Sequence, residues 1–255
     1  MPAPPRKDPA TLERPTTLAI DVGGTGLKAS VLDAQGQLAA NRVRVKTPHP
    51  IDPALLVSTL VTLVKVLPEF DRVSVGFPGV VRSGVIRTAP NLGTDRFRDF
   101  DLAQALGEAW GKPVRVLNDA DMQGFAVMKG KGVEMVITLG TGFGTSLFLD
   151  GALGPHLELA HHSFHKGRTY EEELGDKARK KLGKKKWQRR VAEAIDELRR
   201  LTTFDHLYIG GGNAKRLDLE LPGDVSLVDN TAGILGGIKL WEEKRDRRRV
   251  TGDVG

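Results

Sequence analysis

The chain of 255 residues is 40% hydrophobic, which allows one large domain or two smaller ones with a sizeable core. It has no cysteine, so disulfides, thiolate zinc sites and a cysteine nucleophile are excluded, and a reducing, cytoplasmic location is expected. The formal net charge of +6 favours an anionic partner such as a nucleotide, a phosphate polymer or a nucleic acid.

Residues 1–16 are expected to form a flexible lead. They are rich in proline, and residues 1–7 lack the apolar segment of a signal peptide. No apolar run elsewhere approaches the ~20 residues that a membrane span needs. We therefore expect no membrane partner.

A β hairpin with a glycine-rich turn is predicted near the start of the chain. Two apolar runs, residues 17–20 and 27–32, flank Asp21 and a turn of three glycines and a threonine. Glycines leave backbone amides bare, so such a turn can close around phosphate oxygens, with the charge of Lys28 nearby. An ordinary hairpin turn explains this element alone equally well. A strand follows the turn where Walker and dinucleotide-binding motifs need a helix.

Alternating strands and helices follow this hairpin. Helical spacing covers residues 53–66, a buried strand covers 73–75 and ends in Gly-Phe-Pro-Gly, and a short helix covers 102–110. This alternation indicates a mixed or parallel sheet with helices packed on it. Asn91, in a Pro-Asn-Leu turn, is most simply a turn residue.

A cluster of polar residues lies where a strand is predicted to give way to a helix. The apolar run 114–117 ends in Asn118, Asp119 and Asp121, and a helical apolar stripe follows. Open α/β sheets place ligands at such turns. Asn118 or Asp119 either caps the helix, which is the commoner role, or takes part in catalysis.

The second half of the chain repeats the first hairpin. Residues 136–139 and 146–149 flank a Gly/Thr-rich turn, which suggests a duplicated unit with two phosphate loops facing one another. A third glycine cluster, residues 210–212, follows a strand at 206–209 and is expected to precede a helix. Its amides either face a nucleotide or form a tight turn.

A strongly basic segment follows the second hairpin. Residues 177–190 contain nine basic residues and no acidic one, with Gly183 separating two predicted helices and Trp187 packing the second. A solvated helix face is the commoner explanation, although the segment can also attract a polyanion. Residues 244–249 form a second basic tract, to which we assign no function.

Taken together and in order, eight short motifs resemble the ROK family of sugar kinases, and within it the polyphosphate/ATP glucokinase branch. The motifs are Asp-Val-Gly-Gly-Thr-Gly-Leu-Lys at 21–28, Gly-Phe-Pro-Gly at 76–79, Pro-Asn-Leu at 90–92, Leu-Asn-Asp-Ala-Asp at 117–121, Leu-Gly-Thr-Gly-Phe-Gly at 139–144, Glu-Leu-Ala-His at 158–161, Gly-Gly-Gly at 210–212 and Asn-Thr-Ala-Gly at 230–233.

This resemblance implies an α/β, actin-like ATPase (ribonuclease-H-like) fold with two lobes and a central cleft. The N-terminal lobe would comprise residues 17–117 plus 234–255, and the C-terminal lobe residues 118–233. The lead is too short and too rich in proline for the helix-turn-helix domain of the family's repressors, so we expect no nucleic-acid partner through such a domain.

The resemblance also implies a glucokinase that transfers a phosphoryl group from polyphosphate and/or ATP to the 6-hydroxyl of glucose. Asp119 would be the general base, Asp21 would contact Mg²⁺ through water, and the protein would be a homodimer. The basic segment itself, which follows the second phosphate loop, leads to the separate hypothesis that a long polyphosphate runs along Lys184, Lys185 and Lys186. The alternatives are another hexose kinase, acting on mannose or glucosamine, and a non-catalytic relative that binds a sugar or a polyanion.

The implied sites contain these residues. The sugar would contact Asn91, Asn118, Asp119, Glu158, His161 and Glu171. The phosphates or nucleotide would contact Asp21, Gly23, Gly24, Thr25, Gly26, Lys28, Thr138, Gly140, Thr141, Gly142, Gly144, Gly211, Gly212 and Asn213. Ala160 replaces a family glycine and residues 162–164 depart from the usual run, so we expect a sugar pocket of altered shape.

Overall fold

The first half of the chain builds a five-stranded sheet with the order β3-β2-β1-β4-β7. The computed structural model describes residues 15–228 and 232–242. The predicted hairpin is β1 and β2, β3 continues it antiparallel, and β4 and β7 run parallel to β1. The strands are β1 (Thr17–Val22), β2 (Leu27–Leu32), β3 (Val43–Val45), β4 (Arg72–Phe77) and β7 (Val114–Asn118).

The second half builds a sheet of the same topology, with the order β10-β9-β8-β13-β14. Here too three antiparallel strands are followed by two parallel ones. The predicted duplication is therefore confirmed at the level of strand order and direction. The strands are β8 (Val133–Leu139), β9 (Phe143–Leu149), β10 (Ala152–Leu153), β13 (His206–Gly210) and β14 (Val225–Leu227).

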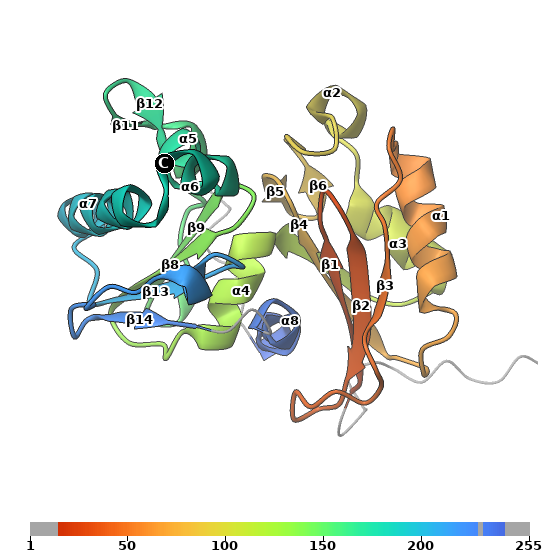
Figure 1. Ribbon diagram of the computed structural model, residues 1–255. Helices are drawn as coiled ribbons and strands as arrows, with labels where there is room; N and C mark the ends of the chain where they lie inside the picture. Colours follow the sequence, from red (N-terminus) through yellow and green to blue (C-terminus); the bar gives the residue numbers. More distant parts are fainter. Residues whose placement is uncertain (1–14, 229–231, 243–255) are drawn as a thin grey trace, which may run out of the picture.

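Amphipathic helices cover the outer faces of both sheets (Figure 1). In α7, Trp187 and the stripe of Val191, Ile195 and Leu198 are buried as predicted, and Trp187 Nε1 donates to Leu174 O at 2.9 Å. The helices α1 (Pro53–Val64) and α3 (Leu102–Trp110) accompany the first sheet, and α5 (Tyr170–Leu174), α6 (Asp176–Leu182) and α7 (Lys184–Thr202) the second.

Several short elements connect these layers. They are α2 (Thr94–Phe97), the two-stranded pairs β5 (Val81–Arg82) with β6 (Val85–Ile86) and β11 (Ser163–His165) with β12 (Arg168–Thr169), and the 3-10 turns η2 (Leu159–His161) and η3 (Ala214–Arg216). None of the helices in the described ranges is long and apolar enough to cross a membrane.

Two helices, α4 (Asp119–Val127) and α8 (Ala232–Glu242), pack against each other between the sheets (Figure 1). Met122 and Phe125 of α4 join a buried cluster with Val136 and Phe148 of the second sheet. On α8, a Cβ at Gly236 would overlap the carbonyl oxygen of Met122. A glycine at this position therefore lets the two helix backbones approach closely.

The prediction of a helix after the third glycine cluster, residues 210–212, is wrong. Only the single 3-10 turn η3 follows, because the Asn213 amide donates to Leu139 O at 2.8 Å and ties the chain to the second hairpin. The predicted boundary between the lobes, after residue 117, falls at the end of β7. The helix α8, which was assigned to the N-terminal lobe, contacts β1 and β4 of the first sheet. The lobe boundaries themselves stay a prediction. The lead up to residue 14, residues 230–231 of the Asn-Thr-Ala-Gly motif and the tract 244–249 lie outside the described residues.

The close contact of α8 with α4 generates a stability prediction. Gly→Ala in a helix ordinarily stabilises a protein by about 0.5–1 kcal/mol. We expect Gly236→Ala to do the opposite and lower the free energy of unfolding by about 2 kcal/mol, because the methyl group forces α8 away from Met122. Denaturant unfolding measures this difference.

Gly223→Ala is the matched control, since a Cβ there has no neighbour within 4 Å. It should leave the free energy of unfolding within about 0.5 kcal/mol of the wild type. A Gly236→Ala protein as stable as this control would contradict the close packing of the two helices.

Candidate active site

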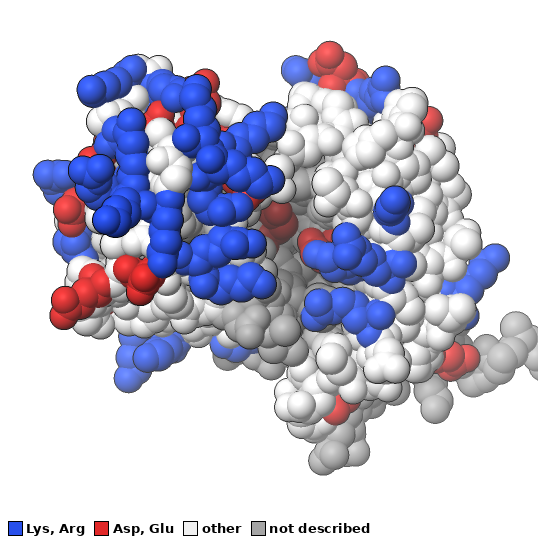
Figure 2. All heavy atoms as spheres, in the orientation of Figure 1, with Lys and Arg blue, Asp and Glu red and all other residues white. Residues whose placement is uncertain are grey.

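The glycine-rich turns of both sheets open onto one cavity of about 580 Å³ between the two halves of the molecule. Its walls combine the turn after β1, the turn between β8 and β9, the turn after β13, and the first residues of α4. Figure 2 shows the surface hollowed between the two halves. The predicted facing of the two loops is thus found in the structure.

Nearly all the predicted site residues line this cavity. All six candidate sugar contacts do so: Asn91, Asn118, Asp119, Glu158, His161 and Glu171. The candidate phosphate contacts in the lining are Asp21, Gly23, Gly24, Thr25, Lys28, Thr138, Gly140, Thr141, Gly142, Gly144, Gly211 and Gly212. The three lysines 184–186 lie outside it, at the start of α7.

Two predicted phosphate contacts hold the loops instead of lining the cavity. The carbonyl of Gly26 accepts a hydrogen bond from the Gly23 amide at 3.0 Å, which closes the first turn. Asn213 is buried, and its Nδ2 donates to Gly140 O at 3.1 Å, which joins the third glycine cluster to the second loop. Both residues therefore shape the walls around the cavity.

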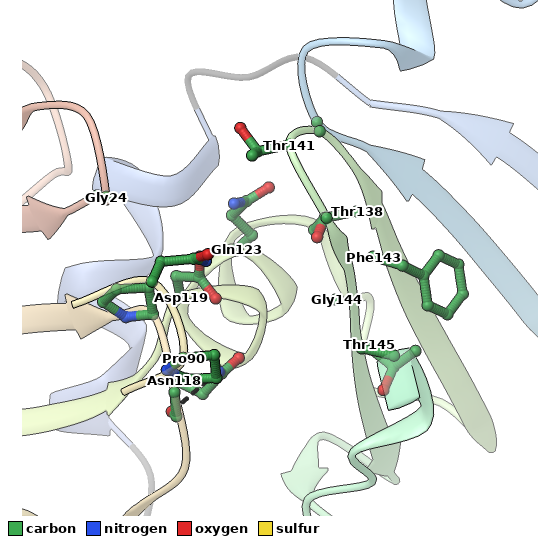
Figure 3. A pocket seen from close by; sticks show the side chains of 18 of the residues that line it. Gly24, Pro90, Asn118, Asp119, Gln123, Thr138, Thr141, Phe143, Gly144 and Thr145 are labelled. Carbon is green, nitrogen blue, oxygen red and sulfur yellow. Dashed lines mark hydrogen bonds between the residues drawn. The ribbon is translucent and has the colours of Figure 1, made fainter. Parts of the chain in front are cut away.

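The capping role expected near residue 118 belongs to Asn118. Its Oδ1 accepts hydrogen bonds from the amides of Ala120 (2.8 Å) and Asp121 (3.4 Å), and its Nδ2 donates to Gly79 O (3.1 Å). Because Asn118 satisfies the first amides of α4, Asp119 is not needed as the cap. Asp119 is the first helical residue, and its side chain faces the cavity (Figure 3).

Asp119 carries the most perturbed carboxyl group of the cavity. Burial in the wall, and next the negative charge of Asp21, raise its pKa to about 7, although a hydrogen bond from the Ala120 amide acts in the opposite direction. A carboxylate with this pKa binds a proton more readily than an ordinary aspartate does. Asp119 can therefore serve as a proton acceptor at neutral pH.

Asp21 and Lys28 form an ion pair at the first loop. Lys28 Nζ donates to Asp21 Oδ2 at 2.7 Å, and the two residues face each other across β1 and β2. Both side chains are about one-third exposed, so each can also reach a ligand in the cavity. The ammonium group lies where it can neutralise phosphate oxygens at the neighbouring glycine turn.

The site fits Mg²⁺ in the way that this ion is usually held. No group of three or more His, Cys, Asp or Glu in residues 15–228 and 232–242 is arranged as a metal site. Mg²⁺ keeps several waters and takes one or two carboxylates together with substrate phosphates. Asp21 can supply such a carboxylate, and its unfavourable interaction with Asp119 is what a nearby cation would relieve.

Glu171 lies at the second loop. It is in the first turn of α5, whose capping box at Thr169 fixes the start of that helix. A Cβ at Gly142 would lie 2.8 Å from Glu171 Oε2, so this carboxylate packs directly on the glycine turn. Its predicted contact with the sugar stays a prediction.

Several residues of the lining were not predicted from the sequence, among them Gln123 and His156. Gln123 is one helical turn after Asp119 on α4 and faces the cavity beside it, opposite Thr138 and Thr141 of the β8–β9 hairpin (Figure 3). The spacing of four residues from Asp119 could have shown this. His156 contacts Asp121 and Glu158. Its contact with Asp121 joins distant parts of the chain, and no local pattern encodes it.

The raised pKa of Asp119 generates a prediction for stability against pH. A carboxyl whose pKa rises from 3.8 to about 7 on folding contributes stability that is lost as the pH rises between these values. Asp119→Asn should therefore be more stable than the wild type at pH 8, by about 2 to 4 kcal/mol, and gain little at pH 4. Thermal unfolding at both pH values checks this. An equal difference at the two would contradict the shift.

Comparison with known proteins agrees with this architecture. The model of the ROK family matches residues 17–163. The polyphosphate glucokinase of Mycobacterium tuberculosis (strain ATCC 25618 / H37Rv) is 32% identical over 233 residues, covering 85% of this chain and 88% of the relative.

Two solved structures show the same fold. The crystal structure of the inorganic polyphosphate/ATP-glucomannokinase from Arthrobacter sp. strain KM is similar with a TM-score of 0.79 and 30% identity, covering 90% of this chain and 100% of that one. A ROK family glucokinase from Streptomyces griseus, in complex with glucose and AMPPNP, has a TM-score of 0.68 at 18% identity and covers 88% and 98% of the two chains. The predicted α/β, actin-like ATPase fold is confirmed, and the chain belongs to the ROK family.

Proposed function

We propose that this protein is a glucokinase that transfers a phosphoryl group from polyphosphate and/or ATP to the 6-hydroxyl of glucose. The observation that carries the proposal is the position of Asp119, a carboxyl with a pKa of about 7, in one cavity with two glycine-rich turns. The names of the relatives in Mycobacterium tuberculosis and Arthrobacter support the same reaction class.

In the proposed reaction Asp119 accepts the proton of the sugar hydroxyl. As it does so, the hydroxyl oxygen forms a bond to the terminal phosphorus of the donor, and the bond from that phosphorus to its bridging oxygen breaks. The products are the sugar phosphate and either ADP or a polyphosphate shorter by one unit. Asp119 needs its raised pKa because an ordinary aspartate is a weak base at pH 7.

The glycine turns would hold the donor. Their bare amides can bind phosphate oxygens, and Lys28 adds a positive charge at the first turn. Mg²⁺, when bound at Asp21, neutralises charge on the transferred phosphoryl group. The third glycine cluster, held to the second loop by Asn213, offers further amides for a nucleotide.

The sugar would lie against the other wall of the cavity. Glu158 precedes the turn η2 and His161 ends it, and the two would present a carboxylate and an imidazole to sugar hydroxyls. Asn91, in the Pro-Asn-Leu turn, lies against Gly24 of the first glycine turn and lines the same cavity. Because Asn118 Oδ1 and Nδ2 are both engaged by the backbone, its contact with the sugar would be an additional hydrogen bond.

A longer donor can continue from the second loop onto the basic helices. The amide of Asp176, at the start of α6, donates to Gly140 O at 2.9 Å, so α6 begins directly beside that loop. Lys and Arg cover this part of the surface and adjoin the hollow (Figure 2). ATP is too short to extend along these helices.

The composition of the first turn of α7 favours a site for a polyanion rather than a helix face that only contacts solvent. It contains Lys184, Lys185 and Lys186, no acidic residue and no side-chain cap, although cations are unfavourable at a helix N-terminus. Lys184 Nζ pairs with Asp218 at 2.7 Å, but both side chains are mostly exposed. Lys185 and Lys186 have no ion-pair partner among the described residues.

The experiment that tests the proposal is a coupled assay with purified protein, a panel of glucose, mannose, glucosamine and N-acetylmannosamine, and both phosphoryl donors. We expect glucose to give the highest kcat/KM. A preference for another hexose would select the alternative of a different hexose kinase. The absence of turnover with every pair would select the non-catalytic relative. The homodimer and the cytoplasmic location stay predictions.

Replacing the proposed base gives a second test. Asp119→Asn keeps the size of the side chain but cannot accept the proton, so we expect kcat to fall about 10²- to 10⁴-fold. Glucose binding measured by calorimetry should change only a few-fold. Asp95→Asn, at a fully exposed side chain, is the control and should keep the wild-type kcat. More than about a tenth of the activity in Asp119→Asn would place the base elsewhere.

The basic helices give a prediction for the donor. Replacing Lys184, Lys185 and Lys186 together with Gln should raise the KM for long polyphosphate and flatten its dependence on salt, because fewer counterions are released. The KM for ATP should change little. Initial rates over a range of salt concentrations measure both.

The control for this variant carries the same loss of charge elsewhere, at the exposed Lys65, Lys112 and Lys131 replaced together with Gln. It should leave both donors unaffected. Equal effects of the first variant on both donors, or no effect on either, would show that the start of α7 is a solvated helix face.

A further inference from the structure

His156 lies between two carboxylates that belong to different parts of the site. Its Nε2 is 2.8 Å from Glu158 Oε1, and its Nδ1 is 3.3 Å from Asp121 Oδ2. Glu158 lines the cavity beside η2, whereas Asp121 is in the first turn of α4, two residues after Asp119. One imidazole therefore joins the wall assigned to the sugar to the helix that carries the proposed base.

Burial makes this contact more than a surface ion pair. The side chain of Asp121 is 6% exposed, and its Oδ1 has no hydrogen-bond partner among the described residues. A buried carboxylate without a cation is strongly destabilising, and burial does raise the pKa of Asp121. His156 is the cationic group beside it, so the imidazolium compensates this charge.

The charge state of His156 follows from its two partners. Burial alone would lower its pKa, but the neighbouring carboxylates of Asp121 and Glu158 raise it to about 10. The hydrogen bond between His156 Nε2 and Glu158 Oε1 also lowers the pKa of Glu158. Two further titratable groups interact electrostatically with this cluster. His161 in η2 interacts with Glu158, and Asp119 on α4 interacts with Asp121. His156 is therefore an imidazolium and Glu158 a carboxylate across the neutral range.

We propose that His156 is a positioning residue that holds the Glu158 carboxylate toward the sugar and fixes it relative to Asp121 on the helix of the general base. This inference rests on the proposed sugar kinase function and assigns to its sugar pocket a residue outside the predicted set. Glu158 needs such support, because its side chain is 39% exposed and His156 is its one hydrogen-bond partner in the described part of the chain.

A positioning role for His156 predicts that its loss changes the KM for the sugar much more than kcat. Without His156 the Glu158 side chain can turn toward solvent, so the sugar loses a charge-assisted hydrogen bond before it reaches the transition state. Burial already raises the pKa of Asp121, so without the imidazolium this carboxyl takes up a proton, and Asp119 and the glycine turns stay in place. Loss of His156 should therefore resemble loss of the Glu158 charge and weaken sugar binding with little effect on the chemical step.

The first measurement is the steady-state kinetics of His156→Asn with glucose. We expect the KM for glucose to rise about tenfold, as in Glu158→Gln, with kcat and the KM for the donor within about twofold of the wild type. His206→Asn is the matched control. This histidine begins β13, its Nε2 contacts the Ser226 hydroxyl at 2.9 Å, and it lies outside the cavity lining. An unchanged KM for glucose in His156→Asn would overturn the proposal.

The second measurement does not depend on turnover. Titration of the His156 ring by NMR should show an imidazolium that persists to about pH 10 in the wild type. Asp121→Asn removes one of the two carboxylates without leaving a buried charge, so it should lower this pKa by more than about one unit. The KM for glucose of this variant should then rise with pH between about 7 and 9, where that of the wild type stays level. If His156→Asn fails to fold, Asp121→Asn still tests the proposal.

The two measurements distinguish failure of this inference from failure of the proposed function. A wild type that phosphorylates glucose, with a His156 that titrates near its ordinary value of 6.5, would overturn the positioning role and leave the kinase intact. A wild type without hexokinase activity, but with a His156 titrating near 10 and shifted by Asp121→Asn, would refute the kinase and retain the ion-paired connection.

Discussion

The proposed reaction depends on the placement of one carboxyl group, that of Asp119, where β7 gives way to α4 between the two sheets. Burial and the charge of Asp21 raise its pKa to about 7, which makes the folded protein less stable at neutral pH and makes the carboxylate a stronger base. Asn118 takes over the cap of α4, and Gly236 lets α8 pack closely against this helix. The fold thus holds the Asp119 carboxylate at a buried position where its negative charge is unfavourable.

Charges are sorted by their position relative to the cavity. Four carboxylates line it, together with Lys28, which pairs with Asp21, His156, which pairs with Glu158, and Arg42; the carboxylates are those of Asp21, Asp119, Glu158 and Glu171. Cations cover the outer surface of α6 and α7 beside the hollow (Figure 2). A neutral hydroxyl substrate suits the acidic interior, and an anionic donor suits the basic approach. This division agrees with a reaction in which two substrates of different charge meet at the glycine turns.

The sequence predicted the elements that depend on local patterns. Both glycine-turn hairpins, the strand-to-helix turn at Asn118 and the apolar stripe after Trp187 follow from spacing and residue type, and the structure contains them. The helix expected after residue 212 was wrong because the tertiary contacts of Asn213 replace it by a 3-10 turn. The contact of His156 with Asp121 joins distant segments, so local patterns could not reveal it.

The most direct test of the account is the pH dependence of kcat/KM for glucose in the wild type, with Asp95→Asn as the control. If Asp119 is the base, the rate of both proteins should fall below a pH of about 7, because Asp119 is then protonated. A rate that is level from pH 5 to pH 8 would contradict the central role of Asp119.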